Sequence, residues 1–285
     1  MARTWRPQRH RADDDRLLLA VGPLHHGVLV MNMRLSIRAS IAAAMLLVTR
    51  VAGAQSAAEH IAAGDKAYVA RDLLGALHHY EEAIAADSSN VEALWKASNA
   101  AVDLGEFNDA ERQSYYSKGE QLGRLAVKAN PQSANAHFAL AKALGRVALS
   151  LGKRDKVKYA RVVHDEAEAA LHLDSLNAGA LHVLGMWNAE IMRLSGFERW
   201  AAKNLLGGKV LGEASWDNAQ RLLERAVSLE PNRITHRLDL AGVYADHDNP
   251  TKAREQYEMV LKSPVVDYND PHYKQLAEEK LKALR

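Results

Sequence analysis

The stretch that decides the fold of this chain is AQRLLERAVSLEP, residues 219–231, in which Ala226 stands five residues before Pro231. The same offset separates three other alanines from a serine or proline that can end a helix: Ala83 from Ser88, Ala126 from Pro131, and Ala170 from Ser175. Such recurrence is internal repetition, and repeated units of this size are helical hairpins that stack into a solenoid. We therefore predict stacked helices with almost no strand.

The spacing of these alanines predicts an irregular array. They lie 43, 44 and 56 residues apart, and 34 residues separate Ala226 from Val260. A tetratricopeptide repeat is about 34 residues long, so the pattern resembles tetratricopeptide hairpins with lengthened central helices and an insertion at residues 196–213. Asp270-Pro271 predicts a closing C-terminal helix, with the aspartate as its cap. We expect an all-α, right-handed solenoid of about five hairpins over residues 55–285.

The first 54 residues have a different composition. A basic stretch from Met33 to Arg38, ten apolar residues from Ala39 to Val48 and the small residues 52–54 have the form of a secretory signal peptide over residues 33–54. We expect cleavage after Ala54 and a periplasmic or secreted mature protein without a stable transmembrane segment; the alternative is an N-terminal membrane anchor or an isolated apolar helix. Residues 1–32 are expected to be a disordered extension or the product of a misplaced start, with translation beginning at Met1, Met31 or Met33.

The charge and cysteine content exclude several classes of protein. The chain has 37 Lys and Arg against 35 Asp and Glu, but residues 1–54 hold eight Arg and three Asp. The remainder therefore has 29 basic and 32 acidic groups, which argues against a nucleic-acid partner. The absence of cysteine excludes disulfides and thiolate metal sites.

The second half of the chain carries a more specific pattern. It contains the runs LHVLGMW (181–187), ER (198–199) and LLGG (205–208), followed in order by Trp216, Pro231 and Ser263-Pro264. This order resembles the regulator of microtubule dynamics family over most of residues 60–285, and the chain is identified as an exported, bacterial-type member. The resemblance implies a tetratricopeptide-like helical domain. Eukaryotic members of the family have organelle or cytoskeletal associations, and one branch is associated with lipid binding and transfer.

The sequence offers little support for catalysis or for a cofactor. It has no G-x-S-x-G, no phosphate-binding G-x-x-x-x-G-K and no paired-carboxylate motif, so we predict a protein that is not an enzyme. His78 and Glu82 lie one helical turn apart and could begin a metal site. No third ligand is identifiable, however, so a solvated helix face is the favoured interpretation and no metal is predicted. Asp246-His247-Asp248-Asn249 is interpreted as a turn between helices.

The concave groove of the solenoid is the predicted binding site. The inner-face positions of the first helices mix aromatic side chains with hydrogen-bonding groups, which suits a protein or peptide partner or an amphiphile. These positions are Asp65, Tyr68, Trp95, Asn99, Val102, Phe138, Lys142, His182 and Met186. The alternative for Trp95 and Phe138 is that they fill gaps between repeats.

The insertion at residues 196–213 has an amphipathic pattern. Phe197, Trp200, Ala201 and Leu205 fall on one helical face, which predicts a lid on the groove or, alternatively, a contact with a membrane surface. Two functions therefore stay open: a non-catalytic scaffold that binds a protein or peptide, and a lipid or amphiphile carrier in which the insertion covers an apolar cavity. Continuous apolar lining behind Phe197 and Trp200 would favour the carrier, and an open polar groove the scaffold.

Overall fold

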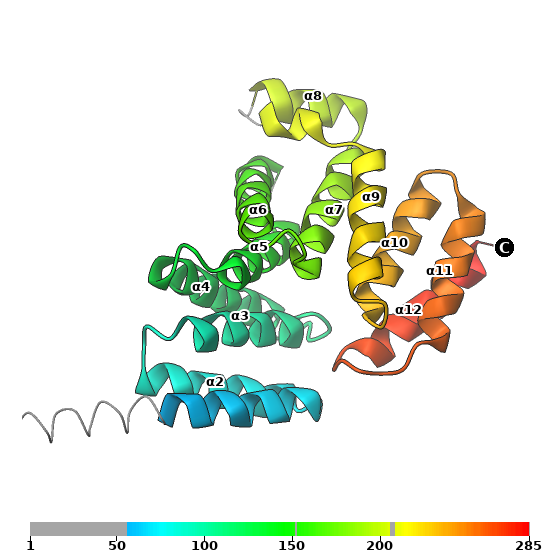
Figure 1. Ribbon diagram of the computed structural model, residues 1–285. Coiled ribbons are helices and arrows are strands. Elements are labelled where there is room, and N and C mark those ends of the chain that lie inside the picture. Colours follow the sequence, from blue (N-terminus) through cyan, green and yellow to red (C-terminus); the bar gives the residue numbers. More distant parts are fainter. Residues whose placement is uncertain (1–55, 152, 206–208, 285) are drawn as a thin grey trace, which may run out of the picture. The chain divides into compact units, whose positions relative to one another are not determined.

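The computed structural model of the protein describes residues 56–151, 153–205 and 209–284. Within these ranges the regular structure is helical and no strand occurs, which confirms the predicted all-α class. The elements, coloured by position in Figure 1, are a helix at residues 56–69, α2 (Leu73–Ala86), α3 (Val91–Gly105), α4 (Arg112–Ala129), α5 (Ala134–Leu149), α6 (Lys153–Leu173), α7 (Ala178–Arg193), α8 (Gly196–Leu205), the short 3-10 helix η1 (Lys209–Glu213), α9 (Trp216–Leu229), α10 (Ile234–Asp246), α11 (Pro250–Lys262) and α12 (Asp270–Ala283).

These helices form a solenoid of hairpins. The helix at 56–69 packs on α2, and the later pairs are α3 with α4, α5 with α6, α7 with α9, and α10 with α11. The insertion that the spacing predicts is α8 with η1, between α7 and α9. The two long helices α4 and α6 have 18 and 21 residues, which explains the 43- and 44-residue intervals.

All four predicted joints have the same turn. The amide of its fourth residue donates to the carbonyl of its first at 3.1 or 3.2 Å, from Asn90 to Asp87, Ser133 to Asn130, Asn177 to Asp174, and Arg233 to Glu230. The repeated alanines lie four residues before this turn. The carbonyl of each alanine accepts a hydrogen bond from the backbone amide of the first residue of the turn. The side chains of Asn90, Ser133 and Asn177 then cap the following helix by accepting from a backbone N–H three residues on.

Small residues set the distance between helices, as the repeat pattern predicts. Ala83, Ala126, Ala170 and Ala226 are all completely buried. Gly185 of the L-x-x-L-G run faces α9, where a Cβ would stand 2.8 Å from Leu223 Cγ. These positions therefore require small side chains because a neighbouring helix occupies the space.

Two positions differ from the sequence-based expectation. Asp270 is the first residue of α12 rather than its cap; its Oδ2 instead accepts from the backbone amides of Val266 and Asp267, at 2.8 Å each. Val102 does not face the groove, because it is completely buried against Tyr116 and Val147 between helices. The residues from Asp246 to Asn249 do form the turn between α10 and α11, with Asp248 at φ 53°.

The segment before α12 turns back onto the first repeats (Figure 1). Asn269 Nδ2 donates to the backbone oxygen of Asp103 at 2.8 Å, across 166 residues of sequence. Phe107 stacks on His272 with ring centroids 4.6 Å apart, and its ring also meets the edge of Tyr273. The C-terminal segment therefore ties the fifth hairpin to the second and bounds the space between them.

Along the described residues no helix combines the length and the apolar character that crossing a membrane requires. The predicted extension at residues 1–32 and the predicted leader at 33–54, with its cleavage point before Gln55, lie outside the described residues. They stay predictions.

Candidate functional site

A cavity of about 1040 Å³ lies on the concave side of the solenoid. The first helix of each hairpin contributes to its wall, because residues spaced three or four apart on a helix share one face. Seven of the candidate site residues line it, as the inner-face pattern predicts: Tyr68, Trp95, Asn99, Phe138, Lys142, His182 and Met186. Asp65 lines it too, and the segment from Asp267 to Asn269 adds a wall that the repeat pattern alone does not predict.

Trp200 is the exception among the candidate residues. Its side chain is 52% exposed and stacks on Phe197, with ring centroids 6.0 Å apart, but it does not line the cavity. Phe197 and Ala201 of the predicted face do line it, together with Glu198 and Ala202. The predicted apolar face was therefore placed a fraction of a turn off, and the side chain of Leu205 lies outside the described part of the chain.

Several basic side chains on the cavity wall lie beside acids from other segments of the chain. Lys142 Nζ lies 2.6 Å from Asp103 Oδ1, and Lys96 Nζ lies 2.7 Å from Asp65 Oδ2. Three further pairs join Arg146 to Glu106, His182 to Asp239, and Arg233 to Asp267 at 3.0, 2.7 and 3.2 Å. The two lysines and two arginines among these residues are thus paired with acids. The sequence placed Asp65 on the inner face, but the other partners could not be predicted because they come from distant segments.

Burial changes the proton affinity of several of these groups. Burial raises the pKa of Glu106, and the Arg146 guanidinium only partly opposes that shift. For Asp239 burial also acts to raise the pKa, but the hydrogen bond from His182 and the nearby charges of Arg146 and Arg193 together outweigh it, and the net pKa lies below the usual value. Burial lowers the pKa of His236 to about 4, so this imidazole is neutral at pH 7.

Three buried polar atoms of cavity-lining residues have no hydrogen-bond partner among the described residues: Asn99 Oδ1, Asn269 Oδ1 and His236 Nδ1. The other polar atoms of two of these side chains are used, since Asn269 Nδ2 bonds to Asp103 and His236 Nε2 lies 3.2 Å from Glu230. Buried polar atoms are nearly always satisfied by protein, water or ligand. Asn99 was predicted from the sequence as an inner-face residue. Asn269 and His236 were not predicted, and Asn269 was passed over because it directly precedes the predicted helix cap at Asp270.

One end of the cavity is mainly apolar, although Lys156, Glu190 and Glu198 from the helices that form this end also line the cavity. Its wall comes from α6, α7, α8 and η1, through Val157, Ala160, Val163, Ile191, Leu194, Ala202 and Leu211. Trp187 also lies here, and its indole N–H donates to the carbonyl of Ala160 at 2.7 Å. Arg199 fixes α8 in place by donating to the carbonyls of Met192 and Leu194. The insertion therefore covers this end of the cavity.

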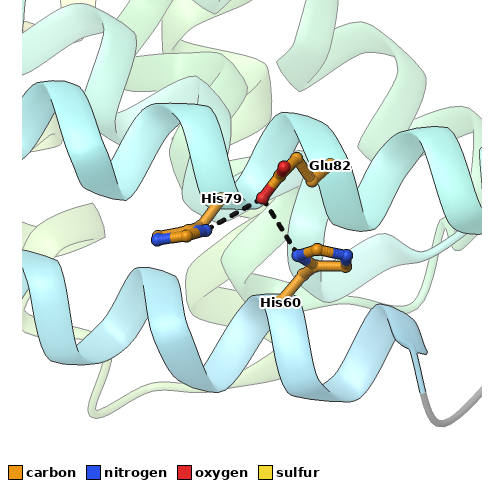
Figure 2. A group of neighbouring side chains, drawn as sticks. All are labelled: His60, His79 and Glu82. Carbon is orange, nitrogen blue, oxygen red and sulfur yellow. Dashed lines mark hydrogen bonds and ion pairs between the residues drawn. The ribbon is translucent and has the colours of Figure 1, made fainter.

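A second cluster lies between the helix at 56–69 and α2 (Figure 2). Glu82 Oε2 accepts from His60 Nδ1 at 3.0 Å and from His79 Nδ1 at 2.9 Å, and His78 Nε2 lies 3.4 Å from Glu82 Oε1. The prediction that no third potential ligand lies near His78 and Glu82 is therefore wrong, because His60 and His79 both contact the Glu82 carboxylate. His60 belongs to the preceding helix and reaches the cluster only through hairpin packing, which a single-helix spacing cannot reveal.

Comparisons with known proteins agree with this architecture. The family model described as "Regulator of microtubule dynamics protein 1-3" matches residues 57–285. Regulator of microtubule dynamics protein 1 of Bos taurus is 23% identical over 159 residues, 55% of this chain and 50% of the relative, and protein 3 of the same organism is 24% identical over 194 residues, 67% and 41%. This chain thus spans about half the length of these relatives or less.

Among solved structures, a thermophilic TPR protein of Thermus thermophilus is similar in fold. Its TM-score is 0.56 at 18% identity, over 78% of this chain and 99% of that one. This likeness concerns the tetratricopeptide-like fold, and the matches indicate no enzyme family.

Proposed function

Because this chain belongs to the regulator of microtubule dynamics family and folds as a tetratricopeptide-like solenoid, we propose that it is a non-catalytic scaffold that binds an extended polypeptide segment in its concave cavity. The observation that carries the proposal is the set of buried atoms without a partner at Asn99, Asn269 and His236. Oδ1 of an asparagine only accepts hydrogen bonds. A polypeptide backbone supplies N–H donors at regular intervals, whereas an acyl chain supplies none.

The rest of the wall supports the same ligand class. Trp95 and Phe138 line the cavity and offer flat apolar surface for side chains of the bound segment. Lys142, Arg146 and Arg233 on the wall are already paired with acids, which leaves them little free positive charge to attract an anionic headgroup or a free carboxylate. Lys156 also lines the cavity and has no ion-pair partner among the described residues. A largely neutral segment with one or two apolar side chains fits this combination.

The test measures the affinity of a peptide selected from a random library against the tag-free chain. Asn99→Ala should weaken binding up to about tenfold, because one net hydrogen bond contributes roughly 0.5–1.5 kcal/mol. Leu74→Ala is the matched control, since Leu74 is 60% exposed on α2 and does not line the cavity. Equal affinity for wild type, Asn99→Ala and Trp95→Ala would place the peptide elsewhere and overturn the proposal.

The apolar end of the cavity favours a second candidate, binding of a lipid or other amphiphile. Val157, Ala202 and Leu211 are among the apolar side chains that line this end, together with the charged Lys156, Glu190 and Glu198, and a mainly apolar wall with a few charged groups is what an amphiphile carrier requires. Ala202→Phe would fill that end and should abolish binding of a fluorescent fatty acid, with peptide binding retained. Fatty-acid binding that is unchanged in Ala202→Phe, or undetectable in wild type, would remove this candidate.

Export to the periplasm or the cell exterior belongs to the proposal as well. It rests on the leader form of residues 33–54, which is a matter of sequence alone. N-terminal sequencing of the native protein should find Gln55 as the first residue. An intact leader beginning at Met33 would contradict export by cleavage.

A further inference from the structure

The cluster of His60, His79 and Glu82 is separate from the cavity and unused by the proposed function. Figure 2 shows the two imidazoles, one from each helix of the first hairpin, converging on a single carboxylate. Both rings turn the same atom, Nδ1, toward Glu82 Oε2, at 3.0 and 2.9 Å. His78 adds a third imidazole beside the other carboxylate oxygen, at 3.4 Å.

We propose that this cluster binds a divalent late transition metal ion such as Zn²⁺, through Nδ1 of His60, Nδ1 of His79 and the carboxylate of Glu82. Imidazole and carboxylate are ligands that zinc takes in proteins, and three protein ligands with an open fourth position form a recurrent arrangement. The fourth position is left to water or to His78, whose Nε2 lies on the Oε1 side of Glu82.

The distances suit such an ion. The potential ligand atoms of the three residues lie within 4.8 Å of one another. At metal–ligand distances of about 2.0–2.1 Å, tetrahedral ligand atoms are separated by about 3.3 Å. The present separations of 2.9 and 3.0 Å from Glu82 Oε2 therefore need to open by only a few tenths of an ångström, which small side-chain rotations supply.

The helices that carry the ligands are fixed by packing. Ala57 and Ile61 on the first helix are buried, as is Ala83 next to Glu82. Gly64 allows Tyr80 to lie against the first helix, since a Cβ there would stand 2.5 Å from the Tyr80 ring. The ligand side chains are themselves 34–37% exposed, so an ion can enter from solvent without opening the hairpin.

A metal bound here would join the first helix to α2 and stabilise the terminal hairpin. The hairpin α3–α4 packs along the first one, and the more distant contact from Arg71 Nη1 to the carbonyl of Val265, at 3.4 Å, is an exposed hydrogen bond. This terminal hairpin is therefore more prone to open than a central one, which has a neighbouring hairpin on both sides. An ion that binds only the closed hairpin stabilises it by mass action. The inferred role is to hold the hairpin closed; because tightly held structural zinc has four protein ligands, a fourth position occupied by water leaves this ion exchangeable.

The test uses Zn²⁺ alone and the full chain without a polyhistidine tag. Isothermal titration of wild type should show saturable binding of one ion, and Co²⁺ in its place should give the visible absorption of a tetrahedral site. His60→Gln should weaken Zn²⁺ binding by at least about tenfold, because even removing groups that merely support metal ligands costs 10–100-fold. Glu82→Gln should do the same, and Zn²⁺ should raise the melting temperature of wild type but not of these two variants.

The matched control is His172→Gln, which removes an exposed histidine on α6, far along the chain from the cluster. Its Zn²⁺ affinity should equal that of wild type. Circular dichroism establishes whether each variant is folded. If His60→Gln does not fold, Glu82→Gln takes its place in the comparison with wild type. Wild type without saturable Zn²⁺ binding, or equal affinity in wild type, His60→Gln and Glu82→Gln, would overturn the proposal and leave the cluster a set of surface hydrogen bonds.

Discussion

Gly123→Ala should destabilise the solenoid, although alanine is the better helix former. A Cβ at Gly123 on α4 would stand 2.9 Å from Cα and 3.2 Å from N of Leu140 on α5. These atoms are backbone, so relief requires α4 and α5 to separate rather than a side chain to rotate. Alanine gains up to about 1 kcal/mol of helix propensity, whereas overpacking costs typically 1–3 kcal/mol. The expected net loss is about 1–2 kcal/mol.

Gly145→Ala is the matched control for this prediction. Gly145 lies inside α5, and a Cβ there has no described atom within 4 Å, apart from its chain neighbours and its own helix. The gain in helix propensity is therefore not opposed by overpacking, and Gly145→Ala should raise the free energy of unfolding by roughly 0.5–1 kcal/mol. Urea denaturation followed by helical circular dichroism compares the two midpoints. Equal or higher stability of Gly123→Ala than Gly145→Ala would refute the close approach of α4 and α5.

Four further predictions concern the packing and the cavity. Ala226→Leu should cost about 1–3 kcal/mol in the same denaturation assay, because Ala226 is completely buried between helices, and an unchanged midpoint would contradict that contact. Lys142→Ala should destabilise the chain by about 1–3 kcal/mol by leaving Asp103 without its partner, and adding Asp103→Ala should restore part of the loss. Trp200→Ala should leave the peptide affinity unchanged, because Trp200 does not line the cavity. Trp95→Ala should weaken peptide binding tenfold or more, because removing an aromatic anchor typically costs about 2 kcal/mol of binding free energy, and fluorescence titration would measure both affinities. Burial lowers the pKa of His236 to about 4 from 6.5, so the folded state binds fewer protons than the unfolded state between these pH values. The free energy of unfolding should therefore be highest above pH 6.5 and fall by roughly 3 kcal/mol as the pH is lowered toward 4. His236→Gln should flatten this pH dependence of the urea midpoint.

The joints of the solenoid could be predicted from sequence because they are built locally. The alanine that accepts the last helical bond, the turn residue and the asparagine or serine cap lie within eight residues of one another, from Ala83 to Asn90 and again from Ala126 to Ser133. Once the register of the repeats is known, helical spacing places Trp95, Phe138 and the other inner-face residues on the concave side.

What could not be predicted depends on contacts between distant segments. Asn269 donates a hydrogen bond to the backbone of Asp103, 166 residues away in sequence. The repeat pattern does not predict that the C-terminal segment returns to the second hairpin. The partners of Lys142 and Arg146 lie on α3 or just after it, in a different hairpin from their own. In the same way His60 approaches Glu82 only when the first two helices are packed.

The cavity-facing side of the short insertion helix was predicted only in part, for a different reason. In α8 an apolar face is defined by few residues, so a rotation of less than one turn exchanges Trp200 for Ala202 at the cavity. Long helices such as α5 repeat the inner-face spacing several times, from Asn135 through Phe138 and Lys142 to Gly145, and this repetition fixes their orientation.

The most direct test of the central claim, that the concave cavity binds a polypeptide segment, is site-specific photo-crosslinking from inside it. A benzophenone amino acid replaces Phe138 in the cavity wall in one variant and the exposed Leu74 on α2 in another, and each is irradiated with the selected peptide. The account predicts a peptide crosslink from position 138 that excess unlabelled peptide abolishes, and none from position 74. Equal crosslinking from both positions, or crosslinking from position 74 alone, would contradict it.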